Sequence, residues 1–266
     1  MENSQLRVAI LTGNELRHNY FVDYISRYLN VVFVAFEKKA NLHEKRDFGK
    51  VGNEIIKKHF NLRKISETKF FLKNYDFSNL DTIGLNTGEI NESNFKNKII
   101  ELNPDYLLLF GCSLVKDEIL NKFKNRVINL HLGLSPYYRG SGTLFWPLVD
   151  NLPECVGSTI HLAVKKIDAG GILKQIRPDI ESSDCSHDIG NKTIIKSAKI
   201  LPELIFKYHQ NKIKPINTNH EFGKLCLRKH LTPSSITKLN KNFKNGIISK
   251  FLTDFKNRIN KYPIIE

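Results

Sequence analysis

Long apolar runs are absent from this chain. Within its 266 residues no stretch approaches the ~20 uncharged apolar residues that a membrane-spanning helix needs. The residues before the first apolar run are few and include Glu2, which is wrong for a secretory leader. With 41% hydrophobic residues and 17 Phe, the chain is also too apolar to be disordered. We therefore expect a folded, cytoplasmic protein with no membrane partner.

Cysteine is scarce as well. The four cysteines, Cys112, Cys155, Cys185 and Cys226, are far apart in the sequence, and none stands at CxxC spacing or beside clustered histidines. This spacing favours neither a zinc site nor a disulfide framework. We expect reduced thiols and no metal.

Acidic residues are outnumbered, with 27 Asp and Glu against 41 Lys and Arg and a formal charge of +14. Lys and Asn are abundant throughout, so the excess is mostly diffuse. It is greatest over 207–266, where 13 Lys and Arg face 3 acids. Such a tail would suit a nucleotide or an RNA, but a solvated lysine-rich surface is the simpler interpretation. We do not expect nucleic acid as a partner.

Apolar runs of strand length alternate with segments of helical spacing. Strands are predicted over 6–12, 31–36, 106–110, 127–131, 159–164 and 172–180. Helices are predicted over 15–29, 51–60, 95–102, 116–123 and 186–208, the last with a bend at Pro202. This order predicts an α/β fold, an open, mostly parallel Rossmann-like sheet with helices on both faces. In such sheets ligands bind beyond the carboxyl ends of the strands.

The character of the chain changes after residue 206. Thr232 and Pro233 are suited to the N-cap and first position of a helix. A stripe of apolar residues then repeats every three or four positions: Ile236, Leu239, Phe243, Ile247, Phe251, Phe255 and Ile259. Gly246 divides this stripe into two predicted helices. We therefore expect a main domain over 1–206 and a small, mainly helical C-terminal extension over 207–266.

Three polar side chains stand where apolar strands end: Asn129, His131 and Asp168. Asn129 and His131 are two apart on one predicted strand, so they point to the same face. Asp168 lies in a tight turn between two later strands. Taken singly, each residue is more often a local cap, a bonded structural histidine or turn chemistry than a catalytic group.

Together with their neighbours these residues resemble the folate-dependent N-formyltransferases, most closely those acting on nucleotide sugars. The family also includes glycinamide ribonucleotide and methionyl-tRNA formyltransferases. Four segments, in the family's order and near its spacing, carry the resemblance: Asn129-Leu130-His131, Pro136-Tyr137-Tyr138-Arg139-Gly140, Thr159-Ile160-His161 and Asp168-Ala169-Gly170-Gly171-Ile172-Leu173. The resemblance implies that residues 1–206 form the catalytic domain.

The resemblance also implies a catalytic Asn-His-Asp triad at Asn129, His131 and Asp168, with 10-formyltetrahydrofolate as donor. An amide and a protonated imidazole would suit the charge that develops on the formyl oxygen, and the carboxylate could orient the histidine and relay a proton. The segment beside the folate would be Gly111, Cys112, Ser113 and Leu114. A substrate phosphate would bind at Gly13, Asn14 and Arg17, where the first strand meets the first helix; plain helix capping is an equal alternative there. His161 is expected to be a packed structural residue.

The short tail fits the sugar enzymes better than the methionyl-tRNA enzymes, which carry a large C-terminal barrel. The first loop, with Glu15 to Arg17, departs from the Gly/Ser-rich loop of the glycinamide ribonucleotide enzymes. We therefore expect a nucleotide-linked 4-amino-4-deoxy sugar as acceptor, in surface-polysaccharide synthesis, and a homodimer is compatible with this reading. The alternatives are glycinamide ribonucleotide or Met-tRNA as acceptor, a formyltetrahydrofolate hydrolase, and a nucleic-acid-binding protein on an inactive scaffold.

Overall fold

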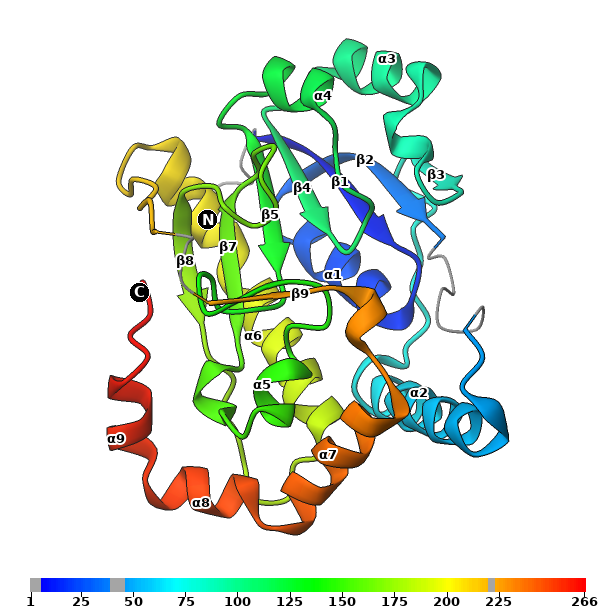
Figure 1. The fold of residues 1–266 in the computed structure, drawn as a ribbon. Helices are drawn as coiled ribbons and strands as arrows, with labels where there is room; N and C mark the ends of the chain where they lie inside the picture. The colour runs from blue at the N-terminus through cyan, green and yellow to red at the C-terminus, as the bar shows by residue number, and fades with distance from the viewer. Residues whose placement is uncertain (1–5, 39–45, 220–222) are drawn as a thin grey trace.

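The computed structural model describes residues 6–38, 46–219 and 223–266. Its centre is a seven-stranded sheet in the order β3-β2-β1-β4-β5-β7-β8 (Figure 1). The first five strands in this order are parallel, and β7 runs antiparallel to both of its neighbours. The strands are β1 (Arg7–Gly13), β2 (Asn30–Glu37), β3 (Thr82–Leu85), β4 (Tyr106–Phe110), β5 (Val127–His131), β7 (Ser158–Leu162) and β8 (Ile172–Ile176).

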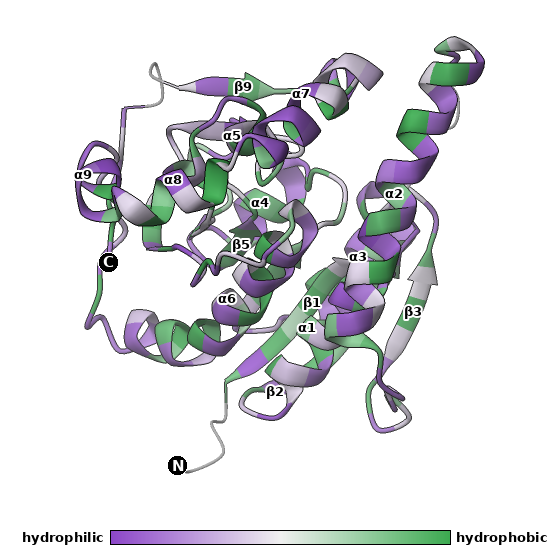
Figure 2. Cartoon of the chain, turned by 90° about the horizontal axis from the view of Figure 1, so that it is seen from below, coloured by the Kyte–Doolittle hydropathy of each residue, from purple (hydrophilic) through white to green (hydrophobic). Residues whose placement is uncertain are grey.

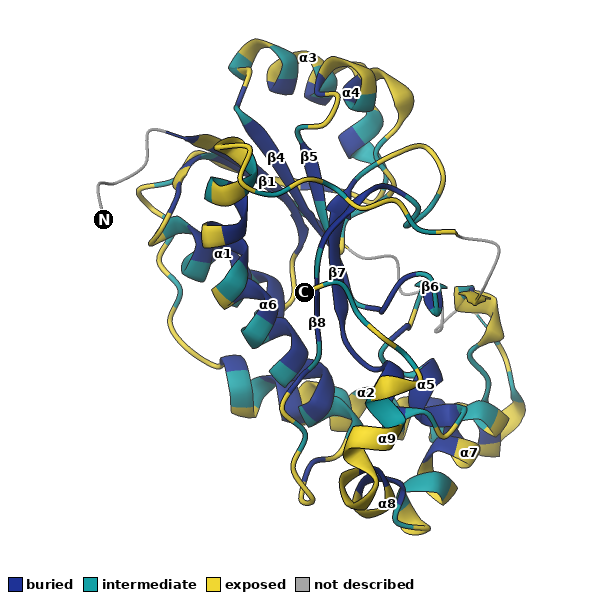
Figure 3. Ribbon diagram, turned by 90° about the vertical axis from the view of Figure 1, so that its left-hand side faces the viewer, coloured by how far each residue is buried: buried dark blue, intermediate teal, exposed yellow. Residues whose placement is uncertain are grey.

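Helices cover both faces of the sheet, as predicted. One apolar cluster joins the sheet to α1 and α6, and a second joins it to α3 and α4 on the other face. The strands between them are almost wholly buried (Figure 3). The helices of the main domain are α1 (Leu16–Ser26), α2 (Gly49–Phe71), α3 (Ser93–Leu102), α4 (Asp117–Lys122), α5 (Trp146–Val149) and α6 (Ser186–His209).

The longest departure from the predicted elements is α2, which spans 49–71 where a helix over 51–60 was expected. Its second half is rich in charged residues, and several apolar side chains face solvent, so no apolar periodicity marks its end (Figure 2). The edge strand β3 was not predicted, because only Leu85 of its residues is buried. Helix α6 runs unbroken past Pro202.

The C-terminal extension packs on the main domain. Its helices are α7 (Pro233–Lys244), α8 (Ile247–Thr253) and α9 (Phe255–Asn260), with Thr232 capping α7 and Gly246 separating α7 from α8, as predicted. Leu239 and Ile247 of the apolar stripe, with the neighbouring Ile248, share one buried cluster with Leu148 and Val149 of α5. The extension therefore has a core in common with the main domain.

Backbone pairing also joins the two parts. Strand β9 (Lys224–Cys226) lies parallel to β6 (Tyr138–Gly140) in a second, two-stranded sheet. Near the C-terminus, the Gln175 amide of β8 donates to the carbonyl of Ile265 at 2.6 Å. Neither contact is visible in the sequence pattern, since each joins segments about 85–90 residues apart.

None of the helices within the described ranges is long and apolar enough to cross a membrane. Residues 1–5, on which the expectation of a leaderless chain rests, lie outside the described residues.

The shared core gives a test of how independent the extension is. Leu239→Ala removes a side chain that is 1% exposed and should cost about 2–5 kcal/mol of the free energy of unfolding. Lys238, the exposed neighbour of Leu239, gives the control: Lys238→Ala should change the free energy of unfolding by less than about 0.5 kcal/mol. Urea unfolding followed by circular dichroism should show one transition that shifts as a whole in Leu239→Ala. Two transitions, of which only one shifts, would show that the extension folds separately.

Candidate active site

The three predicted catalytic residues lie together at the carboxyl end of β5. Asn129 and His131 are on β5, and Asp168 is in the turn between β7 and β8. Cross-strand pairing sets Asn129 opposite His161 of β7. The fold thus brings a fourth polar residue, His161, into the group.

The Asp168 carboxylate is the common partner in this group. Its Oδ2 lies 3.4 Å from Nδ1 of His131, and its Oδ1 lies 3.6 Å from Nε2 of His161. Burial alone would raise the pKa of the Asp168 carboxyl. The two facing imidazoles and the Gly140 amide outweigh burial and lower this pKa to about 2. Asp168 is therefore ionised at neutral pH.

Gly140 fixes the carboxylate from the backbone. Its N–H donates to Oδ2 of Asp168 at 2.8 Å. Gly140 has a φ of 93°, and a Cβ there would come within 2.2 Å of the Cys226 carbonyl oxygen on β9. Both the left-handed backbone and the close strand exclude a side chain. Glycine is thus required where the loop meets both Asp168 and the extension.

His131 is buried with hydrogen-bond acceptors around both ring nitrogens. Its Nε2 lies 3.3 Å from the Tyr138 carbonyl oxygen and 3.5 Å from Oγ1 of Thr143, while Nδ1 faces Asp168. Burial lowers the pKa of His131, and the nearby carboxylate opposes this only in part. The ring is therefore neutral at rest, where a protonated imidazole was expected from the sequence. If the His131 ring gains a second proton, the surrounding acceptors would stabilise the resulting imidazolium.

Asn129 is oriented by His161. The His161 Nδ1 lies 2.9 Å from the Leu162 carbonyl oxygen and donates to it. In the tautomer that has its hydrogen on Nδ1, the His161 Nε2 accepts from Asn129 Nδ2 at 3.0 Å. One amide N–H of Asn129 is used in this bond and a second remains. His161, expected from the sequence to be only packing, bridges two of the three triad residues.

The predicted folate segment follows β4 directly. Gly111 has a φ of 70°, which turns the chain at the strand end, and Leu114 is 66% exposed. The Ser113 amide donates to Oε2 of the buried Glu37 at 2.6 Å, so β2 holds this segment in place. The predicted folate segment is therefore a partly exposed loop at the same edge of the sheet as His131, formed by Gly111, Cys112, Ser113 and Leu114. The exposed backbone at this edge could receive a flat ligand.

The predicted phosphate site differs from the expectation at Arg17. Gly13 ends β1 and Asn14 is exposed, as expected for a loop before α1. A Cβ on Gly13 would meet the His18 ring at 2.5 Å, which explains the glycine by packing alone. Arg17 is only 4% exposed, and its Nη1 bonds both carboxylate oxygens of Glu67 at 2.7 and 2.8 Å. It is a buried anchor and does not present an exposed cation to a ligand.

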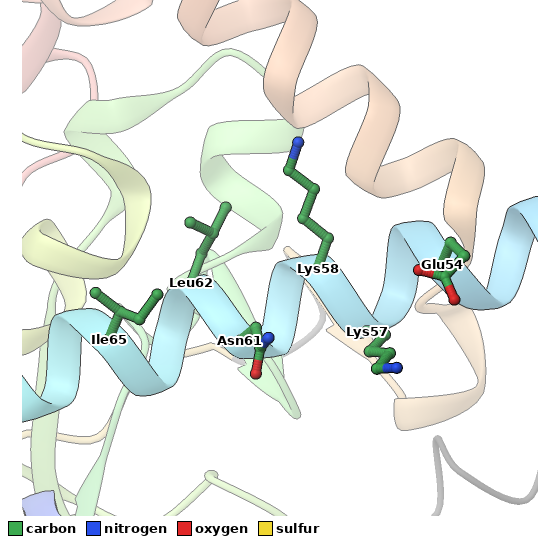
Figure 4. Close-up of a pocket in the computed structure, with 6 residues that line it drawn as sticks. All are labelled: Glu54, Lys57, Lys58, Asn61, Leu62 and Ile65. Carbon is green, nitrogen blue, oxygen red and sulfur yellow. The ribbon is translucent and has the colours of Figure 1, made fainter.

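A cavity of about 590 Å³ lies between α2, the start of α6 and α7. Lys58, His59, Lys69 and His187 are among its lining residues. A shallower hollow of about 310 Å³ lies over the exposed face of α2 (Figure 4). No group of three or more His, Cys, Asp or Glu within the described ranges could hold a metal ion.

Comparison with known proteins agrees with this arrangement. The formyl transferase family matches residues 29–205, which is well over half of the chain. A methionyl-tRNA formyltransferase of Bacillus cereus is 32% identical over 135 residues, which are 50% of this chain and 42% of that protein. The match thus spans less than half the length of the curated relative.

Solved structures share the fold. A glycinamide ribonucleotide transformylase from Symbiobacterium toebii superposes with a TM-score of 0.55 at 16% identity, covering 80% of this chain and 94% of that one. A formyltransferase from Anoxybacillus kamchatkensis was crystallised with UDP-4,6-dideoxy-4-formamido-L-AltNAc and tetrahydrofolate. It superposes with a TM-score of 0.52 at 17% identity, covering 87% of this chain and 97% of that one. With the fold, the ordered motifs and the family match in agreement, this chain belongs to the formyl transferase family.

Proposed function

We propose that this protein transfers the formyl group of 10-formyltetrahydrofolate to the amine of a nucleotide-linked 4-amino-4-deoxy sugar, for surface-polysaccharide synthesis. The observation that carries the proposal is the meeting of Asn129, His131 and Asp168 at one sheet edge, in a member of the formyl transferase family. A binding protein on an inactive scaffold would have no need of a buried, ionised carboxylate facing two imidazoles.

The reaction calls for hydrogen-bond donors and a proton acceptor. The bound donor supplies the formyl carbon, whose oxygen becomes negative as the amine attacks. The bond from this carbon to the folate nitrogen then breaks, and that nitrogen gains a proton as the amine loses one, so that tetrahydrofolate leaves. The second N–H of Asn129 is a donor of the kind that stabilises such an oxygen, and loss of one such donor costs ~10²–10³ in rate in other enzymes. Because His161 fixes the amide, Asn129 needs little rearrangement to act.

His131 suits the transfer of the amine proton. At rest its ring is neutral and can accept a proton. After that, Nδ1 can donate to Asp168 and Nε2 to the Tyr138 carbonyl or Thr143. The ionised carboxylate stabilises the positive ring without being protonated itself, as in general acid–base catalysis.

A structural neighbour favours a nucleotide sugar as the acceptor. The Anoxybacillus formyltransferase was crystallised with UDP-4,6-dideoxy-4-formamido-L-AltNAc and tetrahydrofolate. The Bacillus cereus relative keeps Met-tRNA as a second candidate, and the Symbiobacterium structure keeps glycinamide ribonucleotide as a third.

The acceptor can be tested directly. Purified protein should release tetrahydrofolate from 10-formyltetrahydrofolate in the presence of at least one TDP-, UDP- or GDP-linked 4-amino sugar. The matching keto sugar, which lacks the amine, is the control and should give no release. Transfer only to glycinamide ribonucleotide or Met-tRNA would overturn the acceptor assignment.

Removal of the triad should affect the chemical step more than binding. His131→Ala and Asp168→Asn should each lower kcat by ~10²–10⁴ and Asn129→Ala should act in the same direction. Affinity for an unreactive folate analogue should be unchanged, because these groups act on charge present only in the transition state. The double variant of His131 and Asp168 should be little worse than the more damaged single variant.

Single-turnover formyl transfer measures this effect, and circular dichroism confirms that each variant is folded. A folded His131→Ala protein that keeps most of its rate would contradict the proposed mechanism.

His161 should act as a positioning residue. His161→Ala should lower the thermal midpoint and also lower kcat by about tenfold, because Asn129 loses its partner. His161→Gln, whose side-chain oxygen can accept from Asn129, should recover part of kcat, and the KM for folate should stay constant in both variants. If the folded Ala variant kept full kcat, the residue would serve packing alone.

A further inference from the structure

Glu67 on α2 is shared by two arginines. Arg17 of α1 donates from Nη1 to both of its oxygens, and Arg63, one turn earlier on α2, donates from Nε to Oε1 at 2.8 Å. The side chains of Arg17 and Glu67 are 5% and 7% exposed, whereas that of Arg63 is 38% exposed. The cluster therefore extends from the interior to the surface and ends in Arg63.

The charges of this cluster are all present at neutral pH. Burial lowers the pKa of Arg17 to about 10, which leaves the guanidinium protonated. The neighbouring arginines hold the pKa of Glu67 below its ordinary value despite burial, so the carboxyl is ionised. Glu67 is shared by two cations, and the exposed Glu15 is a further acid near Arg17. The outer cation, Arg63, therefore shares its carboxylate with Arg17 and can take a further anion as its partner.

The guanidinium of Arg63 is placed to receive that anion. Its Nε is fixed by Glu67, and within the described part of the chain no hydrogen bond is formed by Nη1 or Nη2. An arginine held through Nε presents its remaining N–H groups as a fork, which matches phosphate oxygens in pairs. The orientation is set by the protein before any ligand binds, which reduces the entropy lost on binding.

The surroundings of Arg63 are also basic or neutral. The rings of His59 and His187 lie 4.7 Å apart. Burial and the positive charge of Arg63 lower the pKa of His59 to about 3 and that of His187 to about 4, so both rings are neutral. Asp188, the nearby acid, accepts from Ser66 Oγ at 2.6 Å.

Lysines complete the basic surroundings. Lys58 and Lys69 line the 590 Å³ cavity together with Asp188, and Figure 4 shows Lys58 directed to the α7 side of α2. Arg63 does not line this cavity itself, but its charge acts on two residues that do, His59 and His187. Lys69 lies 4.0 Å from Asp188 and offsets its charge. A cavity of this size is typical of small-ligand sites, and the fixed charges around it favour an anionic ligand.

A short path of contacts leads from this region to the catalytic centre. The His59 ring meets the Phe145 ring at 5.5 Å. Phe145 is two residues from Thr143, whose Oγ1 lies 3.5 Å from Nε2 of His131. The loop after β5 thus touches His131 on one side and the basic region on the other. A long ligand with its anionic part near Arg63 could direct its other end to His131.

We propose that Arg63, oriented by the Glu67–Arg17 pair, binds the diphosphate of the nucleotide-linked acceptor. The inference rests on the proposed function, since it assigns the site for the acceptor's charged part. The sequence analysis expected a substrate phosphate at Gly13, Asn14 and Arg17. Of Arg17 and Arg63 only Arg63 reaches the surface, so we assign the anionic part of the acceptor to Arg63.

The test is direct binding of UDP, TDP and GDP to the full chain by calorimetry, with no turnover required. Arg63→Gln should weaken the best-bound nucleoside diphosphate at least ~10-fold, as expected for loss of a charge-assisted contact. Arg63→Lys, which keeps the charge but loses the fork, should fall between. Lys57→Gln is the matched control, because it removes one positive charge from a side chain of α2 that points away from Lys58 (Figure 4), and the Kd of this variant should stay within about twofold of wild type.

Further measurements distinguish a nucleoside diphosphate from folate as the anion that binds at Arg63. Affinity for 5-formyltetrahydrofolate, whose glutamate tail is also anionic, should be the same in Arg63→Gln and wild type. In Arg63→Gln the ion pair between Glu67 and Arg17 remains, so the thermal midpoint of this variant should change little. If Arg63→Gln fails to fold, the same binding measurements on Arg63→Lys test the proposal. With an active nucleotide sugar, the variant should raise the acceptor KM and leave kcat near wild type.

The outcomes separate this inference from the proposed function. Arg63-dependent binding of a nucleoside diphosphate without formyl transfer would uphold the site and reject the sugar acceptor. Formyl transfer to a nucleotide sugar with an unchanged KM in Arg63→Gln would reject the site and keep the function. Loss of folate affinity instead, or no nucleoside diphosphate binding by the wild type, would also overturn the inference.

Discussion

The buried carboxylate of Asp168 is the constraint on which the active-site region depends. Taking a charge out of water is tolerated only if polar partners surround it, and here they come from three separate segments. His131 contributes from β5, His161 from β7, and Gly140 from the end of β6. Gly140 in turn lies against the Cys226 carbonyl of β9. Through the pairing of β9 with β6 the C-terminal extension supports the geometry of the candidate catalytic centre.

The parts of the fold that the sequence predicts well are those decided by local burial. Strands β4 and β5 were predicted residue for residue, because each is a short, mostly apolar run with a clear end, at Gly111 after β4 and at His131 in β5. Helix α2 and strand β3 were predicted poorly, since both face solvent over much of their surface. The β6–β9 pair could not be predicted, because its strands are short and some 85 residues apart.

The candidate site divides in the same way. Asn129 and His131 were considered together because a spacing of two on a strand gives a common face, and Asp168 because it lies in a glycine-rich turn. The resemblance to the formyltransferases joined the three as a predicted triad. The role of His161 depends on the register between β5 and β7, which no local pattern encodes. Likewise the pairing of Arg17 with Glu67 spans 50 residues and became visible only when α2 was placed beside α1.

Two carboxylates, Asp168 and Glu67, define two regions with opposite electrostatic tasks. Asp168 faces two imidazoles, and at least the His131 ring is neutral at rest, so this region is ready to stabilise a positive charge that appears during the reaction. Glu67 faces two guanidiniums that are always charged. A transient charge suits proton transfer, and a permanent one suits an anion that is present throughout. On the proposed assignments, the region around Asp168 is therefore suited to the chemistry and the region around Glu67 to binding of the acceptor.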